Sequence, residues 1–272
     1  MRKTLVDVLF MSEKRKNVLL LLQEGPKETQ SILDKLKTTR TALLPQMRVL
    51  EESFLVVHYD DIYALTKIGE LIVNEMRSLL DTVDVLDVDI EYWGTHKLDF
   101  VPPRLLARIN ELGICRVVSP SITEIFEVNN EFHETSKRSR SLFRITTFLY
   151  PNYPMLLSEL ISNNVEINLI ITDELLNKIR TDNDPGLREL SKTGLIKISI
   201  YPGEMGFLSF AYNDYQLLLN PIKTDGDFDK KHILSENPGA LEWGKELYGH
   251  YLKDAVPVSD IWQVSNPGLS AE

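Results

Sequence analysis

The side chains best suited to chemistry in this sequence are basic, hydroxyl and amide groups gathered in one short segment. Arginine can bind guanine through two hydrogen bonds and glutamine can bind adenine, so Arg40, Arg48 and Gln46 suit the base edges of DNA. Lys35 and Lys37 precede them and suit phosphates, which fix the position of a protein on the duplex. The predicted contact set is Lys35, Lys37, Thr38, Thr39, Arg40, Thr41, Gln46 and Arg48. Double-stranded DNA is the expected partner.

Two alternatives stay open for this segment. The helix that carries it could be a solvated face that docks to a protein instead of DNA. Pro45 lies inside the segment, and proline removes one backbone hydrogen bond and disfavours helical geometry at the preceding residue. Either the helix is kinked at Pro45, or regular helix begins there and leaves Arg40 and Thr41 in the preceding turn.

Other residues that could carry chemistry form no catalytic or metal pattern. The five histidines are scattered, with no His-Glu-x-x-His, Gly-x-Ser-x-Gly or glycine-rich phosphate loop. Residues 225–236 resemble a calcium loop, but Lys230 stands where the sharp turn needs glycine. The single cysteine, Cys115, excludes an internal disulfide and lies in an apolar run typical of a buried strand. A redox role, with Arg116 lowering its thiol pKa, stays open. We expect no enzyme, metal or cofactor.

Charge is divided unevenly along the 272 residues. The net charge of −10 argues against nucleic acid, but residues 1–50 hold ten Lys and Arg against five Asp and Glu, and the remainder holds twenty against thirty-five. This division predicts a basic interaction module attached to an acidic body. The composition is globular, no apolar run reaches the roughly 18 residues of a membrane span, and no signal peptide is evident. We therefore expect a cytoplasmic protein without a membrane partner.

The elements that position the contact set follow from hydrophobic periodicity and turn residues. We predict helices at about 5–10, 12–25, 28–36 and 39–53, the last capped by Thr38, then a hairpin at 54–65 and a helix at 67–86. This order is that of a winged helix-turn-helix, in which the helix after the turn enters the major groove. The hairpin tip, Asp60-Asp61, would repel phosphate. The wing is thus expected to be mainly structural, with His58 and Tyr59 as its contact groups.

The helix predicted at 67–86 repeats apolar residues at spacings of 4, 3, 4 and 3. The members of this seam are Ile72, Met76, Leu79, Val83 and Leu86. A heptad seam favours a homodimer, whose two half-sites on DNA would be spaced by about 10 base pairs. The alternative is burial of the same residues against their own chain.

A second region has the alternation of an α/β domain with a mixed, partly parallel sheet. The predicted strands are 143–148, 165–171, 195–200, 207–212 and 215–220, and the predicted helices are 102–112, 121–133, 153–162, 173–180 and 238–253. The fold class is thus α+β or α/β, with a winged helix-turn-helix at 1–86, an α/β regulatory domain at 87–260 and a tail at 261–272. Residues 87–94 are predicted as the connection.

An effector site is expected in the second domain, because ligands of open α/β sheets bind beyond the carboxyl ends of strands. Aromatic and polar residues follow two predicted strands at such positions. The candidates are Tyr150, Tyr153, Thr172 and Asp173. Ordinary loop packing is the alternative.

Several motifs together resemble one family. They are Ser12-Glu13-Lys14-Arg15, Leu19-Leu20-Leu21-Leu22, Ala42-Leu43-Leu44-Pro45-Gln46, Tyr63-Ala64-Leu65-Thr66-Lys67-Ile68-Gly69, Tyr92-Trp93 with His96, and Tyr150-Pro151-Asn152-Tyr153-Pro154. Nearly the whole chain, to about residue 255, resembles the winged-helix transcriptional regulators of methanogenic archaea. The resemblance implies an ArsR-like DNA-binding domain, a dimer, and a methanogen-associated domain that senses or relays a signal, in some members for methanol methyltransferase genes. It supplies no ligand.

The expected function is therefore sequence-specific transcriptional regulation by a homodimer that responds to an unknown small-molecule effector. The alternative is an adaptor whose winged helix docks to a protein of the transcription machinery. Salt separates the two, because DNA binding weakens steeply with salt through counterion release. An enzyme in the α/β domain is a third hypothesis with no motif in its support.

Overall fold

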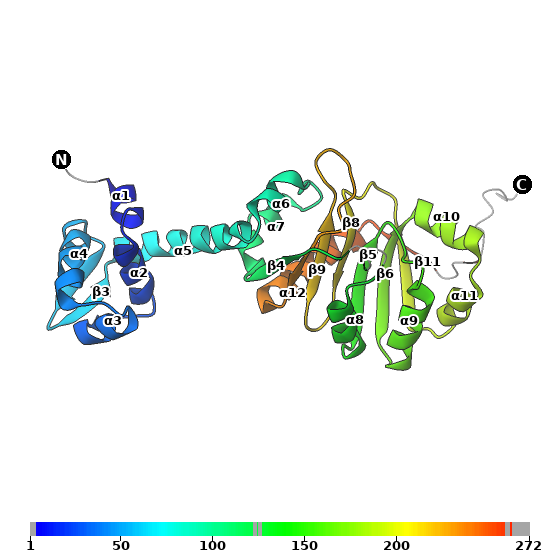
Figure 1. The fold of residues 1–272 in the computed structure, drawn as a ribbon, viewed down its shortest axis with the longest axis horizontal. Coiled ribbons are helices and arrows are strands. Elements are labelled where there is room, and N and C mark those ends of the chain that lie inside the picture. The colour runs from blue at the N-terminus through cyan, green and yellow to red at the C-terminus, as the bar shows by residue number, and fades with distance from the viewer. Residues whose placement is uncertain (1–3, 122–123, 125–126, 259–261, 263–272) are drawn as a thin grey trace, which may run out of the picture. The chain divides into compact units, whose positions relative to one another are not determined.

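A computed structural model describes residues 4–121, 124, 127–258 and 262 of the chain. The chain divides into two compact units, residues 1–82 and 83–272 (Figure 1). Helix α5 (Lys67–Asp87) contains the boundary between them. Among the described residues the strands form two sheets, one of three strands and one of eight.

The first unit is a winged helix-turn-helix, as predicted. Its elements are α1 (Leu5–Phe10), α2 (Glu13–Leu22), β1 (Lys27–Glu28), α3 (Thr29–Lys35), α4 (Arg40–Glu52), β2 (Val56–Tyr59), β3 (Ile62–Leu65) and α5. Strands β2 and β3 pair antiparallel to form the wing, and the short β1 pairs with the other edge of β3. Helices α3 and α4 are the two helices on either side of the turn.

Helix α4 begins at Arg40 and runs unbroken past its proline. Its N-cap is Thr39, whose hydroxyl accepts a hydrogen bond from the backbone N–H of Ala42 at 3.4 Å, so the prediction that Thr38 caps this helix was wrong by one residue. Pro45 is the sixth residue of the helix. Pro45 therefore costs the helix the backbone hydrogen bond to the carbonyl four residues earlier, and the helix continues through it nonetheless. Arg40 and Thr41 therefore lie in the helix, and the alternative that placed them in the turn was wrong.

The core of the first unit joins every helix to the hairpin. The buried apolar side chains include Val18, Leu19 and Leu22 of α2, Ile32 of α3, Leu43, Met47 and Leu50 of α4, and Val73 and Met76 of α5. Gly69 allows α5 to approach the hairpin, because a Cβ there would lie 2.1 Å from the carbonyl oxygen of Leu55. The Thr66 hydroxyl accepts a hydrogen bond from the Gly69 N–H and donates one to the Phe54 carbonyl. These contacts fix where α5 leaves the wing.

The second unit is an α/β domain built on a mixed sheet. Its strands are β4 (Cys115–Val118), β5 (Ser141–Thr146), β6 (Glu166–Thr172), β7 (Ile196–Tyr201), β8 (Phe207–Tyr212), β9 (Leu217–Pro221), β10 (His232–Ser235) and β11 (Val256–Val258). Its helices are α6 (Ile90–Thr95), α7 (Pro103–Leu106), a 3-10 turn (Ile109–Leu112), α8 (Asn130–Lys137), α9 (Tyr153–Ser162), α10 (Asp173–Asp182), α11 (Pro185–Ser191) and α12 (Pro238–Leu252). The predicted mixed, partly parallel sheet is confirmed.

The sheet has the strand order β11-β7-β6-β5-β8-β9-β10-β4. Strands β5, β6 and β7 are parallel to one another, and every other pairing is antiparallel. Helices α8, α9, α10 and α11 cover one face of the sheet, and α6, α7 and α12 cover the other (Figure 1). Both faces of the central strands are consequently buried, which explains their nearly continuous apolar sequences.

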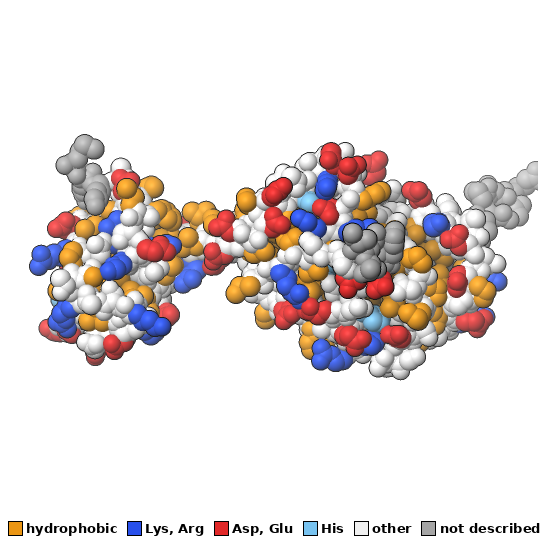
Figure 2. Space-filling model, viewed as in Figure 1, with side chains coloured by type: hydrophobic (Ala, Val, Ile, Leu, Met, Phe, Trp, Pro, Cys, Tyr) orange, Lys and Arg blue, Asp and Glu red, His pale blue; other side chains and the backbone are white. Residues whose placement is uncertain are grey.

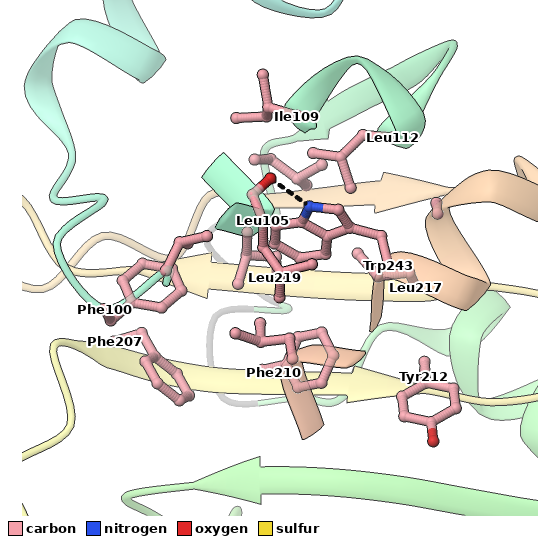
Figure 3. Close-up of a cluster of buried hydrophobic side chains, with 14 of the residues drawn as sticks. Phe100, Leu105, Ile109, Leu112, Phe207, Phe210, Tyr212, Leu217, Leu219 and Trp243 are labelled. Carbon is pink, nitrogen blue, oxygen red and sulfur yellow. Dashed lines mark hydrogen bonds between the residues drawn. The ribbon is translucent and has the colours of Figure 1, made fainter. Parts of the chain in front are cut away.

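Trp243 of α12 is the centre of one of these two layers. Its ring is completely buried, and its indole N–H donates to the carbonyl of Leu105 at 2.9 Å (Figure 3). Figure 3 shows the ring between the helical segment that carries Leu105 and Leu112 and the strands that carry Phe210 and Leu217. The same layer contains Tyr92 and Trp93 of α6, so α12 and the chain that follows α5 share one core.

Several predictions for the second unit need correction. The helix expected at 121–133 begins at Asn130, because Asn129 caps it, and residues 122, 123, 125 and 126 lie outside the described residues. Residues 87–94, predicted as a connection, end α5 and enter α6. Strands β10 and β11 and helix α11 were missed. Of the tail expected at 261–272, the described part is Trp262, which packs against the sheet layer formed by α9, α10 and α11.

Candidate nucleic-acid interface

Helix α4 has one apolar face in the core and one polar face in solvent. Leu43, Met47 and Leu50 are fully buried, whereas Arg40, Thr41 and Arg48 are exposed. Arg40 and Arg48 are eight residues apart, slightly more than two helical turns, so both side chains leave the helix on its solvent side. The helix after the turn thus offers two guanidinium groups and a hydroxyl, the donors that major-groove recognition uses.

The turn before α4 carries the other predicted cations. Lys37 is exposed, with a φ of 47°, and its position is fixed by a hydrogen bond from the Thr38 N–H to the Leu33 carbonyl. Lys35 is the last residue of α3, and its ammonium lies 2.9 Å from the carboxylate of Glu24. The hydrogen bond from Lys35 lowers the pKa of Glu24. Exposed pairs of this kind are weak, so a phosphate can replace Glu24 as the partner of Lys35.

Gln46 is engaged within its own domain. Its side-chain oxygen accepts hydrogen bonds from Arg15 Nη1 at 2.8 Å and from the Ser12 hydroxyl at 3.2 Å. A bidentate contact to adenine needs both the oxygen and the nitrogen of this amide. Gln46 must therefore leave Arg15 and Ser12 before it can read a base in the predicted way.

Arg15 is a structural cation that sequence analysis counted among the basic charges. It is only 4% exposed, and it donates to the carbonyls of Val8 at 2.6 Å and Asp7 at 3.0 Å. These carbonyls belong to the last turn of α1, where the Asp7 carbonyl also accepts a hydrogen bond from the Met11 N–H. Because Arg15 also binds Gln46, it joins α1, α2 and α4 and is not free for DNA.

The wing tip is acidic for a structural reason. Asp60 and Asp61 both have positive φ, as two-residue hairpin turns of type I′ require, and Asp tolerates this conformation better than most residues. The Asp61 carboxylate accepts a hydrogen bond from the Thr29 hydroxyl at 2.6 Å, and its carbonyl accepts one from the Thr29 N–H. The tip thus holds the start of α3, which agrees with a mainly structural wing. His58 and Tyr59 are exposed on β2.

The first unit as a whole is electrically balanced. Residues 1–82 hold twelve Lys and Arg and twelve Asp and Glu, because acids of the wing and α5 offset the excess found at 1–50. Figure 2 shows basic and acidic side chains interspersed on the visible face of this unit. Attraction to DNA must therefore come from the local arrangement around α4, and not from the net charge of the unit.

The seam predicted on α5 divides into buried and exposed members. Met76 is buried in the core of the first unit and Ile72 packs against it, whereas Leu86 packs on the core of the second. Leu79 and Val83 are 52% and 41% exposed. Ile68 and Leu71, which the prediction omitted, are 54% and 65% exposed and extend the same side of the helix. Figure 2 shows apolar side chains along α5.

The predicted effector residues separate into two groups. Thr172 is the N-cap of α10, where its hydroxyl accepts from the Leu175 N–H, and Asp173 is the exposed first residue of that helix. Both residues therefore stabilise the N-terminus of α10, as a cap and as an acid of the first turn. Tyr153 is buried at the start of α9, and Tyr150 is half-buried in the preceding turn. These two tyrosines lie beside Arg144 of β5, a residue that sequence analysis did not select.

The remaining candidates do not form a site in the described part of the chain. Cys115 is buried on the edge strand β4, and burial raises the pKa of its thiol, which opposes a redox role. Within the described residues, no group of three or more His, Cys, Asp or Glu side chains could hold a metal ion. No helix among them is long and apolar enough to span a membrane.

The element order and the exposed basic face of α4 place the first unit in the winged helix-turn-helix class. Residues 3–84 match the model of the N-terminal domain of the methanogenesis regulatory protein FilR1, and residues 125–254 match the model of its middle domain. The two domains follow in the order of that family. Each unit of this chain is thus similar to one domain of FilR1.

Individual relatives are more distant. The methanogenesis regulatory protein FilR1 of Methanothrix harundinacea (strain 6Ac) is 22% identical over 98% of this chain, and the chain spans 61% of that protein's length. Among solved structures, one of TrmBL2, an archaeal chromatin protein, aligns with 93% of this chain and with 98% of the TrmBL2 chain. The identity is 12% and the TM-score is 0.42. The structure of a phospholipase D family member, Nuc from Salmonella typhimurium, aligns with 48% of this chain and with 90% of the Nuc chain. The identity is 8% and the TM-score is 0.38.

Proposed function

We propose that this protein is a transcriptional regulator that reads double-stranded DNA with α4. The observation that carries the proposal is the exposed face of α4 with Arg40, Thr41 and Arg48 directly after the turn. In helix-turn-helix proteins this helix lies in the major groove, where arginine binds guanine through two hydrogen bonds. Lys35 and Lys37, which precede the helix, would contact phosphates and so fix the position of the helix on the duplex.

The acting form in this proposal is a homodimer of ArsR-like type. The exposed apolar side chains Ile68, Leu71, Leu79 and Val83 on α5 are the support, because a second copy of the helix would cover them. Leu79 and Val83 are exposed and remain candidates for the seam, whereas Met76 is buried in the core of the first unit. A two-fold dimer would place two α4 helices about one DNA turn apart.

The second unit would sense or relay a signal and so change the spacing or orientation of the two α4 helices. A ligand achieves this only if it binds one dimer arrangement better than the other. The matches to FilR1 domains favour methanogenesis genes as targets. The family resemblance of the sequence suggests methyltransferase genes among them. Support for a sensing role comes from the size and separate core of this unit.

The experiment is a gel-shift titration of the full chain with DNA from upstream of its own gene, at graded salt. We expect the logarithm of the binding constant to fall linearly with the logarithm of the salt concentration, with a slope near −0.9 for each phosphate neutralised. Binding that is absent at low salt, or that does not change with salt, would show that the winged helix docks to a protein instead.

A further inference from the structure

Arg144 is a buried cation without a counter-ion. The residue is 4% exposed and lies in β5, near the middle of the sheet. No carboxylate among the described residues lies within ion-pair distance of it, and its buried Nε has no hydrogen-bond partner there. The ring of Tyr153 lies beneath the guanidinium, with its centre 5.7 Å from the guanidinium carbon. A cation–π contact compensates only part of the loss of hydration.

The strand neighbours explain why the side chain fits but do not explain its charge. In the register of the sheet, Arg144 stands between Leu169 of β6 and Ala211 of β8. Both neighbours are buried and apolar, and the small Ala211 leaves space for the long arginine stem. Buried charges in folded proteins are normally paired or hydrogen-bonded. A leucine at this position would serve the core better than an unpaired arginine.

Arg15 and His133 show how other buried basic groups among the described residues are paired. Arg15 donates to two carbonyls and an amide oxygen. His133 of α8 lies 2.8 Å from Glu159 of α9, and this hydrogen bond lowers the pKa of Glu159. Lys137 lies 3.8 Å from the same carboxylate, so Glu159 already has two basic partners. The unpaired state of Arg144 is therefore a local feature and not a general property of the fold.

Arg144 lines a small cavity between α8 and α9, which lie next to each other on one face of the sheet (Figure 1). The cavity measures about 20 Å³, and its wall includes Phe132, Ser136, Tyr153 and Leu156. A space of this size admits one water-sized group. Tyr150 lies close enough for Arg144 to oppose the rise that burial causes in the pKa of its hydroxyl. The guanidinium of Arg144 thus lies among mostly apolar and aromatic walls, to which His133 and Ser136 add polar groups.

We propose that Arg144 anchors an oxyanion, the carboxylate or phosphate group of a small ligand, in the groove between α8 and α9. Guanidinium binds both groups through paired hydrogen bonds, and these bonds are strong where water is excluded. The cavity takes one oxygen of the anionic group, and the rest of the ligand lies outward over the apolar side chains Leu156 and Val128, which also line it. This inference deepens the proposed sensing role of the second unit by naming its site and its ligand class.

Binding is tested without DNA, by isothermal titration and thermal melting of the full chain. The probes are sodium acetate, sodium hexanoate and inorganic phosphate, each compared with sodium chloride at equal ionic strength. We expect one class of oxyanion to raise Tm more than chloride does, and Arg144→Met to weaken its binding at least tenfold. Arg140→Met is the control, because Arg140 is exposed and pairs with Asp214 on the surface. A preference for hexanoate identifies a carboxylate ligand, and a preference for phosphate identifies a phosphoryl ligand.

The ligand-free stability of the variants gives a second, independent result. Removing an unpaired buried charge relieves a desolvation penalty, so Arg144→Met without added oxyanion should melt at or above the Tm of the wild type. Should this variant fail to fold, Arg144→Lys keeps the charge but loses the paired donors, and it should bind the oxyanion at least tenfold more weakly. Equal responses of wild type and Arg144→Lys, or no oxyanion response in the wild type beyond that of chloride, would overturn the site. That result would leave the proposed DNA binding intact, because the gel-shift titration tests DNA binding separately.

Discussion

Alanine at both Arg40 and Arg48 is expected to weaken binding to the upstream DNA by at least about 1,000-fold. Each arginine that binds guanine through two hydrogen bonds contributes about 1–3 kcal/mol, and a dimer would lose four such contacts. Both side chains are exposed and outside the buried core of the first unit, so the variant should fold normally. Equilibrium gel-shift titration of wild type and variant at one salt concentration measures the loss.

A matched control variant removes two positive charges from positions outside α4. Lys67→Ala with Lys178→Ala deletes two exposed cations, one at the start of α5 and one in α10, each paired only with an acid on its own helix. This control should bind DNA within a few-fold of the wild type. If the double variant of Arg40 and Arg48 bound DNA with the same affinity as the control, α4 could not be the recognition surface.

Glutamate in place of Leu79 is expected to convert the homodimer into a monomer. In the proposed seam each Leu79 would face apolar side chains of the second copy, where a carboxylate would be desolvated without a partner. Loss of the link between two DNA-binding units removes the avidity of the second half-site, which is worth about 100- to 10,000-fold. Sedimentation velocity reports the oligomeric state, and a gel shift on DNA with both half-sites reports the affinity.

Asn74→Glu is the control for this substitution. Asn74 is exposed, lies five residues before Leu79 and projects from α5 about 140° away from it. A carboxylate there can still accept the hydrogen bond from Gln23 that the Asn74 amide oxygen accepts, so the control adds the same charge away from Leu79 and should leave the dimer intact. A Leu79→Glu protein that still sediments as the wild type does would assign the exposed residues of α5 to some other partner.

The first unit was largely predictable because its signals are local. Caps, turn residues and a change from helical to alternating periodicity lie within a few positions of the elements that they define. Thr39 replaced Thr38 as the cap because either hydroxyl suits that role, and the choice depends on backbone angles. The helix continues through Pro45 because Leu43, Met47 and Leu50 on either side of it are buried in one core, and this packing is not visible in the sequence alone.

The parts that were missed depend on contacts between residues far apart in the chain. The bond from Arg15 to Gln46 joins residues 31 positions apart and removes both from the simple picture of basic DNA contacts. Strand β10 is short and follows an acidic loop, so it became visible only through its pairing with β9 and β4. Arg144 lies in a run that reads as an ordinary strand. Its lack of a counter-ion is a property of the folded surroundings and has no local signal.

The residues assigned to DNA and to dimerisation stay predictions, but the structure ranks them. Arg40, Thr41 and Arg48 are free for contact, whereas Thr39 caps α4 and Gln46 binds Arg15. Among the seam residues, Leu79 and Val83 are available to a second copy, and Met76 is not. Experiments directed at the free residues therefore carry the most information.

Directed cleavage from α4 is the most direct test of DNA reading by this helix. A cysteine introduced at the exposed Thr41 can carry an iron chelate, and the native Cys115 should stay unlabelled because it is buried and burial raises its thiol pKa. The full chain bound to its upstream DNA should then cut at two clusters about 10 base pairs apart, one for each half-site. The same chelate on a cysteine at Ser162, the exposed last residue of α9 in the second unit, should produce no such clusters. Uniform cleavage from Thr41→Cys, or the same pattern from Ser162→Cys, would contradict the docking of α4 in the major groove.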